Sequence, residues 1–157
     1  MYLRAVVAFL ALPGVVAGVV PALLAASDEH RRGGWGIGFA LLALGMILLL
    51  WCVRDFFVSG RGTLAPWEPP KRLVVVGLYR FVRNPMYLAV LIVLLGWSLG
   101  TGSYLIAGYA VIVAIGFHLR VLLYEEPWLR RQFGTEWETY FSSVRRWLPR
   151  LSAWHAP

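Results

Sequence analysis

Four long apolar blocks leave this chain few ways to fold. They cover residues 5–26, 35–58, 86–99 and 104–123. Three of them reach the roughly 20 residues that a helix needs to cross a bilayer, and interfacial residues ahead of the third block add to its shorter length. A bilayer offers no water to backbone N–H and C=O groups, so such blocks favour helices. We therefore predict an all-α protein, an integral membrane helical bundle with about four transmembrane helices.

The composition agrees with a membrane protein. Apolar residues make up 59% of the chain, and the mean hydropathy is +0.66, whereas soluble domains contain about 45–50% apolar residues. The single cysteine, Cys52, excludes an intrachain disulfide framework and a cysteine-based metal cluster, and we predict no metal site. The net charge of +7 is typical of nucleic-acid binding or of basic loops beside anionic lipids. In a membrane protein we favour the second interpretation and expect no nucleic-acid partner.

The basic residues lie mostly on one side of the predicted bundle. That side carries Arg61, Lys71, Arg72, Arg80, Arg83, Arg130, Arg131, Arg145, Arg146 and Arg150. The other side has only Arg31 and Arg32, which Asp28 and Glu29 offset. By the positive-inside rule, we predict a multi-pass protein with both termini in the cytoplasm. We expect it in a bacterial inner membrane rather than the endoplasmic reticulum, with membrane lipids around it.

We expect residues 1–157 to form a single domain. Residues 1–58 supply two N-terminal spanning helices, and the chemistry lies in residues 77–157. Small residues after the first apolar block are also typical of a secretory signal, but the block is longer than a signal core. We therefore interpret it as a transmembrane helix.

The polar stretch from residue 77 to residue 87 leads into the third apolar block. Asn84 is a favoured N-cap residue, and Pro85 suits the first helical position because its missing N–H costs nothing there. A helix is therefore predicted to begin at Pro85. Arg83, Asn84 and Tyr87 gather a cation, an amide and a phenol at its N-terminus, which favours a site for a small charged ligand.

Ionisable side chains also gather at the end of the fourth block. His118 and Glu125 are seven residues apart, so they share one helix face if the helix continues that far. Charged residues near a bilayer invite a functional hypothesis. Structure alone also accounts for them, since Glu126 can pair with Arg130 at the surface and Arg120 can snorkel. In the predicted topology both polar clusters lie on the cytoplasmic side, where they can meet.

From residue 124 onward the chain is polar and amphipathic, which predicts a cytoplasmic C-terminal helical segment. Thr135 followed three residues later by Glu138 is typical of a capping box, with Gly134 ending the preceding helix. The tail over residues 144–150 mixes arginine with tryptophan and leucine, as membrane-surface segments do.

The two polar motifs and the end of the chain together resemble the isoprenylcysteine carboxyl methyltransferase and phospholipid methyltransferase superfamily of integral membrane enzymes. The resemblance covers roughly the second half of the chain. The residues that carry it are Gly77, Tyr79, Arg83, Asn84, Pro85, Tyr87, Glu125, Glu126, Leu129, Phe133, Gly134, Trp147, Leu148 and Pro149.

The resemblance implies a small helical enzyme that uses S-adenosylmethionine, held in a pocket that the C-terminal segment closes. Residues 77–157 are then the cofactor-binding half, and a lipophilic acceptor enters from the bilayer. The chain departs from the family pattern at three positions. Asn84 stands where histidine is usual and cannot act as a titrating base, Trp137 stands where tyrosine is common, and Arg145 replaces a frequent proline.

Methyl transfer from a sulfonium depends mainly on positioning. Arg83 is our candidate for the cofactor's carboxylate, and Glu126 or Glu125 for its ammonium group. We expect Arg83, Glu125 and His118 to be the catalytic residues, with His118 or a glutamate as base if the acceptor is an amine. Aromatic faces attract a methylsulfonium. The remaining residues expected to bind the cofactor are Tyr79, Asn84, Pro85, Tyr87, Phe133, Tyr140 and Trp147.

These observations predict a methyltransferase acting on a lipophilic or lipid-like carboxylate or amine at the cytoplasmic membrane face. A membrane reductase of the sterol-reductase type is an alternative that requires NADPH binding. A non-catalytic lipid-binding protein is a second alternative. It requires that the charges pair internally and that no polar pocket opens at the cytoplasmic face.

Overall fold

The computed structural model describes residues 10–29, 33–60 and 72–155, and all regular structure in these ranges is helical. The elements in chain order are a π-helical segment Leu10–Val19, α2 Val20–Ser27, α3 Trp35–Gly60, a 3₁₀ turn Gly77–Arg80, α4 Pro85–Thr101, α5 Tyr104–Arg120, a π-helical segment Val121–Glu125 and α6 Glu126–Ser143. The predicted all-α class is therefore confirmed for the described residues.

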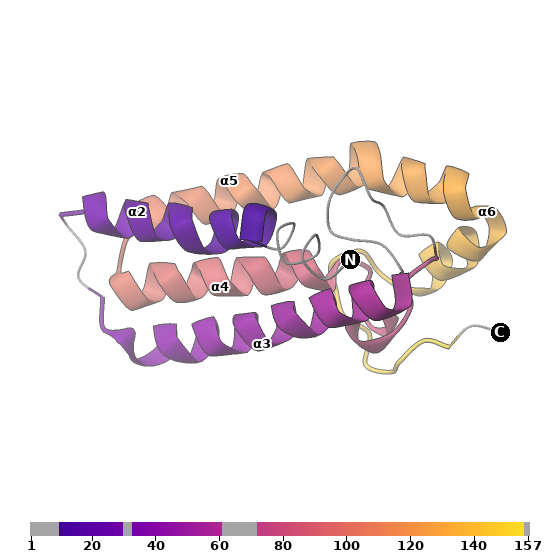
Figure 1. Cartoon of the computed structure of the whole chain (residues 1–157), viewed down its shortest axis with the longest axis horizontal. Helices are drawn as coiled ribbons and strands as arrows, with labels where there is room; N and C mark the ends of the chain where they lie inside the picture. The colour runs from indigo at the N-terminus through magenta and orange to yellow at the C-terminus, as the bar shows by residue number, and fades with distance from the viewer. Residues whose placement is uncertain (1–9, 30–32, 61–71, 156–157) are drawn as a thin grey trace.

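The helices lie side by side as rods and form a bundle (Figure 1). The segment Leu10–Val19 and α2 make the first rod, and α3, α4 and α5 make the others. By length and composition, Gly36–Phe56 and the continuous helical stretch Tyr104–Ser143 can each cross a membrane, while Pro13–Ser27 and Pro85–Thr101 are shorter apolar helices. The helical membrane bundle is confirmed. How many rods cross the bilayer remains a prediction.

The outward faces of the rods are apolar. Large apolar side chains such as Ile37, Ile112 and Leu123 are mostly exposed, at 72%, 68% and 71% respectively. Apolar surface of this extent on a protein marks contact with another apolar phase. The bundle therefore has the surface that a lipid environment requires.

Glycines bring α3 and α4 into the most extensive helix contact of the bundle. A Cβ added to Gly38 would lie 2.4 Å from the Cα of Gly100, and one added to Gly96 would lie 2.8 Å from the backbone nitrogen of Leu42. Gly96 and Gly100 are four residues apart and present one small face, the pattern that lets membrane helices approach closely. At these glycines the backbones of α3 and α4 are therefore too close to leave room for a side chain between them.

A tight turn joins α4 to α5, and the two helices pack as a hairpin. Gly102 follows α4 with φ of 67°, a left-handed conformation that glycine adopts without steric cost. Ser103 then caps α5, because its Oγ accepts the N–H of Ile106 at 3.4 Å. The Ser103 hydroxyl also donates to Asp28 at the end of α2. This end of the bundle is therefore tied together by polar contacts.

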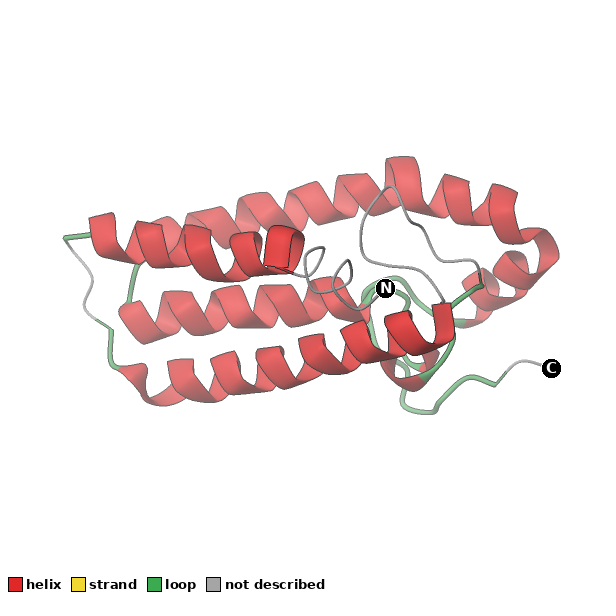
Figure 2. Cartoon of the chain, viewed as in Figure 1, coloured by secondary structure: helices red, strands yellow, loops and turns green. Residues whose placement is uncertain are grey.

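The opposite end carries the start of α4, the end of α5, α6 and the C-terminal segment (Figures 1 and 2). α6 kinks at Gly134, with φ of 50° and ψ of −121°, and turns back toward the bundle. Gly134 therefore interrupts the helix as predicted. The predicted capping role of Glu138 is replaced by an ion pair of Glu138 with Arg130, whose Nε lies 2.5 Å from Oε1.

Part of the predicted orientation rests on Arg31, Arg32, Arg61 and Lys71, which lie outside the described residues. The first residues of the first apolar block, 5–9, also lie outside them. The orientation in the membrane therefore remains a prediction.

Gly77 shapes the turn that precedes the site. Its φ is 52°, and a Cβ there would collide with Oδ2 of the buried Asp55. We expect Gly77→Ala to destabilise the protein by about 1–2 kcal/mol from the left-handed backbone alone, with the collision adding to that cost. Thermal unfolding in detergent measures the loss. A loss of no more than about 2 kcal/mol would show that the collision with Asp55 adds nothing.

Candidate functional site

The predicted helix start is correct, but Asn84 does not cap it. α4 begins at Pro85, and the Asn84 side chain makes no capping hydrogen bond. Its Nδ2 instead donates to the carbonyl of Arg146 at 3.2 Å. Asn84 therefore joins the entrance of α4 to the C-terminal segment.

The C-terminal segment runs along residues 80–84 through backbone hydrogen bonds. The N–H of Arg83 donates to the carbonyl of Arg145 at 3.0 Å, and the N–H of Arg150 donates to the carbonyl of Phe81 at 2.9 Å. The hydroxyl of the buried Tyr140 donates to the carbonyl of Tyr79 at 2.7 Å. Segments that are distant in the sequence therefore form one wall.

Arg83, Glu126 and Arg146 form an ion cluster on this wall, which we call the Glu126 cluster. Arg146 donates from Nε to Oε1 at 2.7 Å and from Nη2 to Oε2 at 2.8 Å, a bidentate contact. Arg83 Nη1 lies 3.2 Å from the same Oε1, and the exposed fractions of the Arg83 and Glu126 side chains are only 7% and 11%. Two cations and one anion leave the cluster with a net positive charge, which favours an anionic ligand.

Aromatic rings surround the Arg83 guanidinium, which lies 4.1 Å from the ring centre of Phe141 and 5.7 Å from that of Trp137. Burial lowers the pKa of Arg83, while the nearby Glu126 raises it. The hydrogen bond to Glu126 raises the pKa of Arg146. An arginine pKa is high enough that both groups stay charged at neutral pH.

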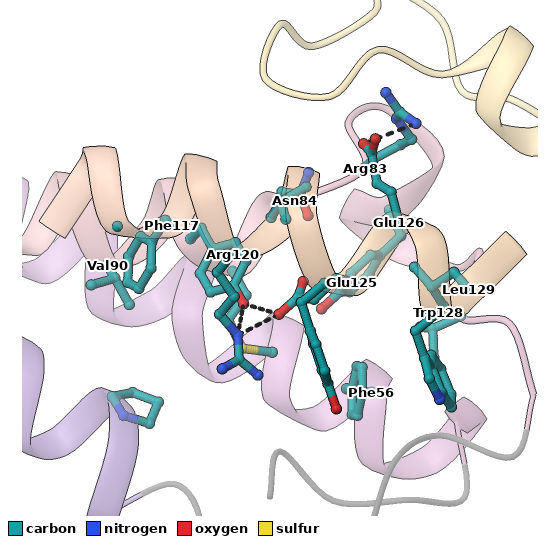
Figure 3. Close-up of a pocket in the computed structure, with 18 of the residues that line it drawn as sticks. Phe56, Arg83, Asn84, Val90, Phe117, Arg120, Glu125, Glu126, Trp128 and Leu129 are labelled. Carbon is teal, nitrogen blue, oxygen red and sulfur yellow. Dashed lines mark hydrogen bonds and ion pairs between the residues drawn. The ribbon is translucent and has the colours of Figure 1, made fainter. Parts of the chain in front are cut away.

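Tyr87, Arg120 and Glu125 form a second cluster, which we call the Glu125 cluster. Arg120 donates from Nε to Oε1 of Glu125 at 2.7 Å and to the hydroxyl of Tyr87 at 3.2 Å. The Tyr87 hydroxyl donates to Glu125. Figure 3 shows the Arg83–Glu126 pair and the Arg120–Glu125 pair pointing in different directions from the chain.

Glu125 and Glu126 are adjacent, and neighbouring helical residues leave the helix about 100° apart, so their side chains point in different directions. A π-helical segment, Val121–Glu125, precedes Glu126. Its last hydrogen bond runs from the N–H of Glu126 to the carbonyl of Val121. This bond spans one residue more than a hydrogen bond of an α-helix. Pro127 follows in the first turn of α6 and has no N–H to continue a regular ladder. The π-helical turn accommodates the backbone donor that Pro127 lacks. Such turns are frequent at functional sites. Pro127 therefore begins a helix rather than ending one.

Arg83 and Glu126 of the Glu126 cluster and all three residues of the Glu125 cluster line one cavity of about 530 Å³. Its other walls are mostly apolar and include Val90 and Phe117, which Figure 3 shows beside Arg120. The first half of the chain contributes Pro13, Val16 and Phe56. The cavity thus joins polar groups at one end of the bundle to an apolar space between the helices.

Seven of the predicted site residues line this cavity: Tyr79, Arg83, Asn84, Tyr87, Glu125, Glu126 and Tyr140. Pro85 is buried at the helix start, and Phe133 packs edge-on against the cavity residue Trp128, with ring centres 6.1 Å apart. Their roles in binding stay predictions.

His118 does not share a contact with Glu125. It accepts a hydrogen bond from Nε1 of Trp147 at 3.1 Å, and neither residue lines the cavity. The π-helical turn breaks the seven-residue register on which the shared face depended. The predicted surface pair of Glu126 with Arg130 is also replaced, because Glu126 pairs with Arg83 and Arg146.

The sequence does not predict the roles of Arg146 and Trp137. Arg146 is one of several basic residues of the tail, but in the structure it holds both oxygens of the cavity residue Glu126. Trp137 stands out in the sequence only as a departure from a family pattern, but it is 3% exposed and lines the cavity. The sequence feature that points to Arg146 is its position in a tail that mixes arginine with tryptophan and leucine.

Comparison with known proteins places this architecture among membrane enzymes. The family model for phospholipid methyltransferases matches residues 35–136. An uncharacterized protein of Haemophilus influenzae is 36% identical over 63 residues, which are 40% of this chain and all of that protein. Probable protein-S-isoprenylcysteine O-methyltransferases of Oryza sativa subspecies indica and japonica are each 33% identical over 87 residues. That match covers 53% of this chain and 44% of the rice proteins, and no solved structure matches the chain.

Proposed function

Because the chain belongs to the phospholipid methyltransferase family, we propose that it transfers a methyl group from S-adenosylmethionine to a lipophilic or lipid-like acceptor. We place this reaction at the cytoplasmic face of the membrane, with both termini in the cytoplasm. The observation that carries the proposal is the meeting of Arg83 and Glu126 at the wall of a largely apolar cavity. The rice relatives, named as probable methyltransferases of a lipid-modified cysteine, support a lipid-like acceptor.

The residues of the cavity fit a zwitterionic methyl donor. Arg83 would hold the donor's carboxylate, and Glu126 its ammonium group, since each is buried enough to make a charge-assisted hydrogen bond strong. S-adenosylmethionine, when bound, supplies an electrophilic methyl group on a sulfonium. The faces of Tyr87 and Tyr140 attract such a cation.

The chain's own contribution is positioning and exclusion of water. Apolar walls formed by Val90, Val113 and Phe117 would hold the acceptor's hydrocarbon beside the polar groups. Arg120 and Tyr87 hold Glu125 at the cavity, where it is our candidate base for an amine acceptor. A carboxylate acceptor needs no base.

The non-catalytic alternative accounts for one observation. The charges do pair internally, as it requires, in both clusters. These same pairs line a cavity, however, and that alternative requires that no polar pocket opens beside them.

Binding of the methyl donor tests the proposal directly. Isothermal titration of the purified protein with S-adenosylmethionine and with its demethylated product should show binding, and titration with NADPH should show none. Arg83→Ala should weaken donor binding about 10- to 100-fold, the effect of losing a hydrogen bond to a charged group. Arg130→Ala is the matched control, because Arg130 forms a largely exposed pair with Glu138.

The proposal would be overturned if the folded wild-type protein bound neither S-adenosylmethionine nor its demethylated product. If the donor binds, transfer of label from methyl-labelled donor into a lipid extract, compared between cells with and without the protein, would identify the acceptor class.

A further inference from the structure

Three nitrogen donors that belong to residues lining the cavity are themselves buried and have no acceptor among the described residues. They are Nε and Nη1 of Arg83 and Nε1 of Trp137. Nη1 of Arg83 lies at ion-pair distance from Glu126, 3.2 Å, but its N–H is not directed at the carboxylate. Buried polar groups in folded proteins are almost always hydrogen-bonded, so a cluster of unpaired donors requires a specific explanation.

The surroundings of these donors favour an anion rather than a neutral acceptor. The exposed fraction of the Arg83 side chain is 7%, that of Trp137 is 3%, and both residues line the cavity. The guanidinium lies 5.7 Å from the Trp137 ring centre. The Glu126 cluster carries a net positive charge. A carboxylate has two oxygens, about four lone-pair sites, and can accept from several donors at once.

We propose that Arg83 and Trp137 together bind the carboxylate of the methyl donor, and that the indole N–H of Trp137 is a specific cofactor-binding group of this chain. This inference rests on the proposed function. The donor's ammonium group, bonded to the same carbon as the carboxylate, then lies beside Glu126. Arg146 holds Glu126 through both carboxylate oxygens, so the glutamate stays in place when the ligand is absent.

Two ligands that differ only in the carboxylate test this assignment. S-adenosylhomocysteine carries the group, and its decarboxylated form, S-adenosyl-3-thiopropylamine, keeps the ammonium and the nucleoside. Trp137→Phe keeps a buried ring and removes the N–H. It should weaken binding of S-adenosylhomocysteine about tenfold, the cost of one hydrogen bond to a charged group. Binding of the decarboxylated ligand should be unchanged.

Trp128→Phe is the matched control, because Trp128 also lines the cavity but its nitrogen is not among the buried unpaired donors. It should leave the preference for the carboxylate as in the wild type. Arg83→Lys provides a second variant if Trp137→Phe does not fold. It keeps the charge but loses the planar fork of donors, so it should reduce the same preference.

The outcomes separate this inference from the proposed function. If wild-type protein binds S-adenosylhomocysteine and Trp137→Phe keeps the full preference for the carboxylate, the inference is overturned and the proposed function stands. Equal weakening for both ligands also overturns it, because the N–H would then serve the fold or another part of the ligand. If folded wild-type protein binds neither ligand, the proposed function fails, and the inference fails with it.

Discussion

Glu126→Gln is expected to cost the protein both stability and donor binding. Glu126 is the common partner of Arg83 and Arg146, and its side chain is 11% exposed. Removing one member of a buried ion pair leaves an uncompensated charge, at a cost of about 3–5 kcal/mol. Because the substitution also removes the proposed partner of the donor's ammonium group, affinity should fall about 100-fold. Thermal unfolding in detergent and isothermal titration measure the two effects.

Glu138→Gln is the matched control for this experiment. Glu138 lies on the same helix, α6, and pairs with Arg130, but the two side chains are 49% and 58% exposed. Exposed ion pairs contribute about 0–1 kcal/mol, so this variant should remain close to the wild type in both measurements. If Glu126→Gln and Glu138→Gln behave alike, the Glu126 cluster neither stabilises the fold nor binds the donor.

Gly38→Leu is expected to separate the two most closely packed helices. All three atoms nearest to a Cβ at Gly38 are backbone atoms of α4, at 2.4 to 2.9 Å, so no side chain can move aside. Overpacking costs about 1–3 kcal/mol and can cost more where backbone must shift. We expect loss of folded, monodisperse protein in detergent, measured by size-exclusion chromatography and circular dichroism.

Gly108→Leu separates packing from the intrinsic effect of replacing glycine in a helix. Gly108 lies in α5, and nothing lies within 4 Å of a Cβ built there. Glycine is about 0.8–1.0 kcal/mol less favourable than alanine in a helix, and leucine ranks just below alanine, so this variant should be as stable as the wild type or slightly more stable. Equal behaviour of Gly38→Leu and Gly108→Leu would contradict close packing of α3 against α4.

The helical bundle could be predicted from the sequence because a long apolar block in a membrane satisfies its backbone hydrogen bonds by forming a helix. The start of α4 at Pro85 followed from the local chemistry of Asn-Pro, although the Asn84 side chain binds the C-terminal segment instead of capping. The meeting of Arg83 with Glu126 followed from helix alternation, which places the start of the third block and the end of the fourth at the same end of the bundle.

Contacts that depend on irregular backbone were not predictable in this way. Arg146 reaches Glu126 only because α6 kinks at Gly134 and the following segment pairs with residues 80–84. Neither feature produces a periodic pattern in the sequence. Regular helical spacing predicts that His118 and Glu125 share one face, but the π-helical segment between them changes that spacing. The unpaired indole of Trp137 has no signature in sequence at all.

The two acidic clusters are also joined through the backbone of one helix. Glu125 and Glu126 are covalent neighbours, yet one is held by Arg120 and Tyr87 and the other by Arg83 and Arg146. A displacement of the helix backbone at these two residues would therefore move both sets of contacts at once.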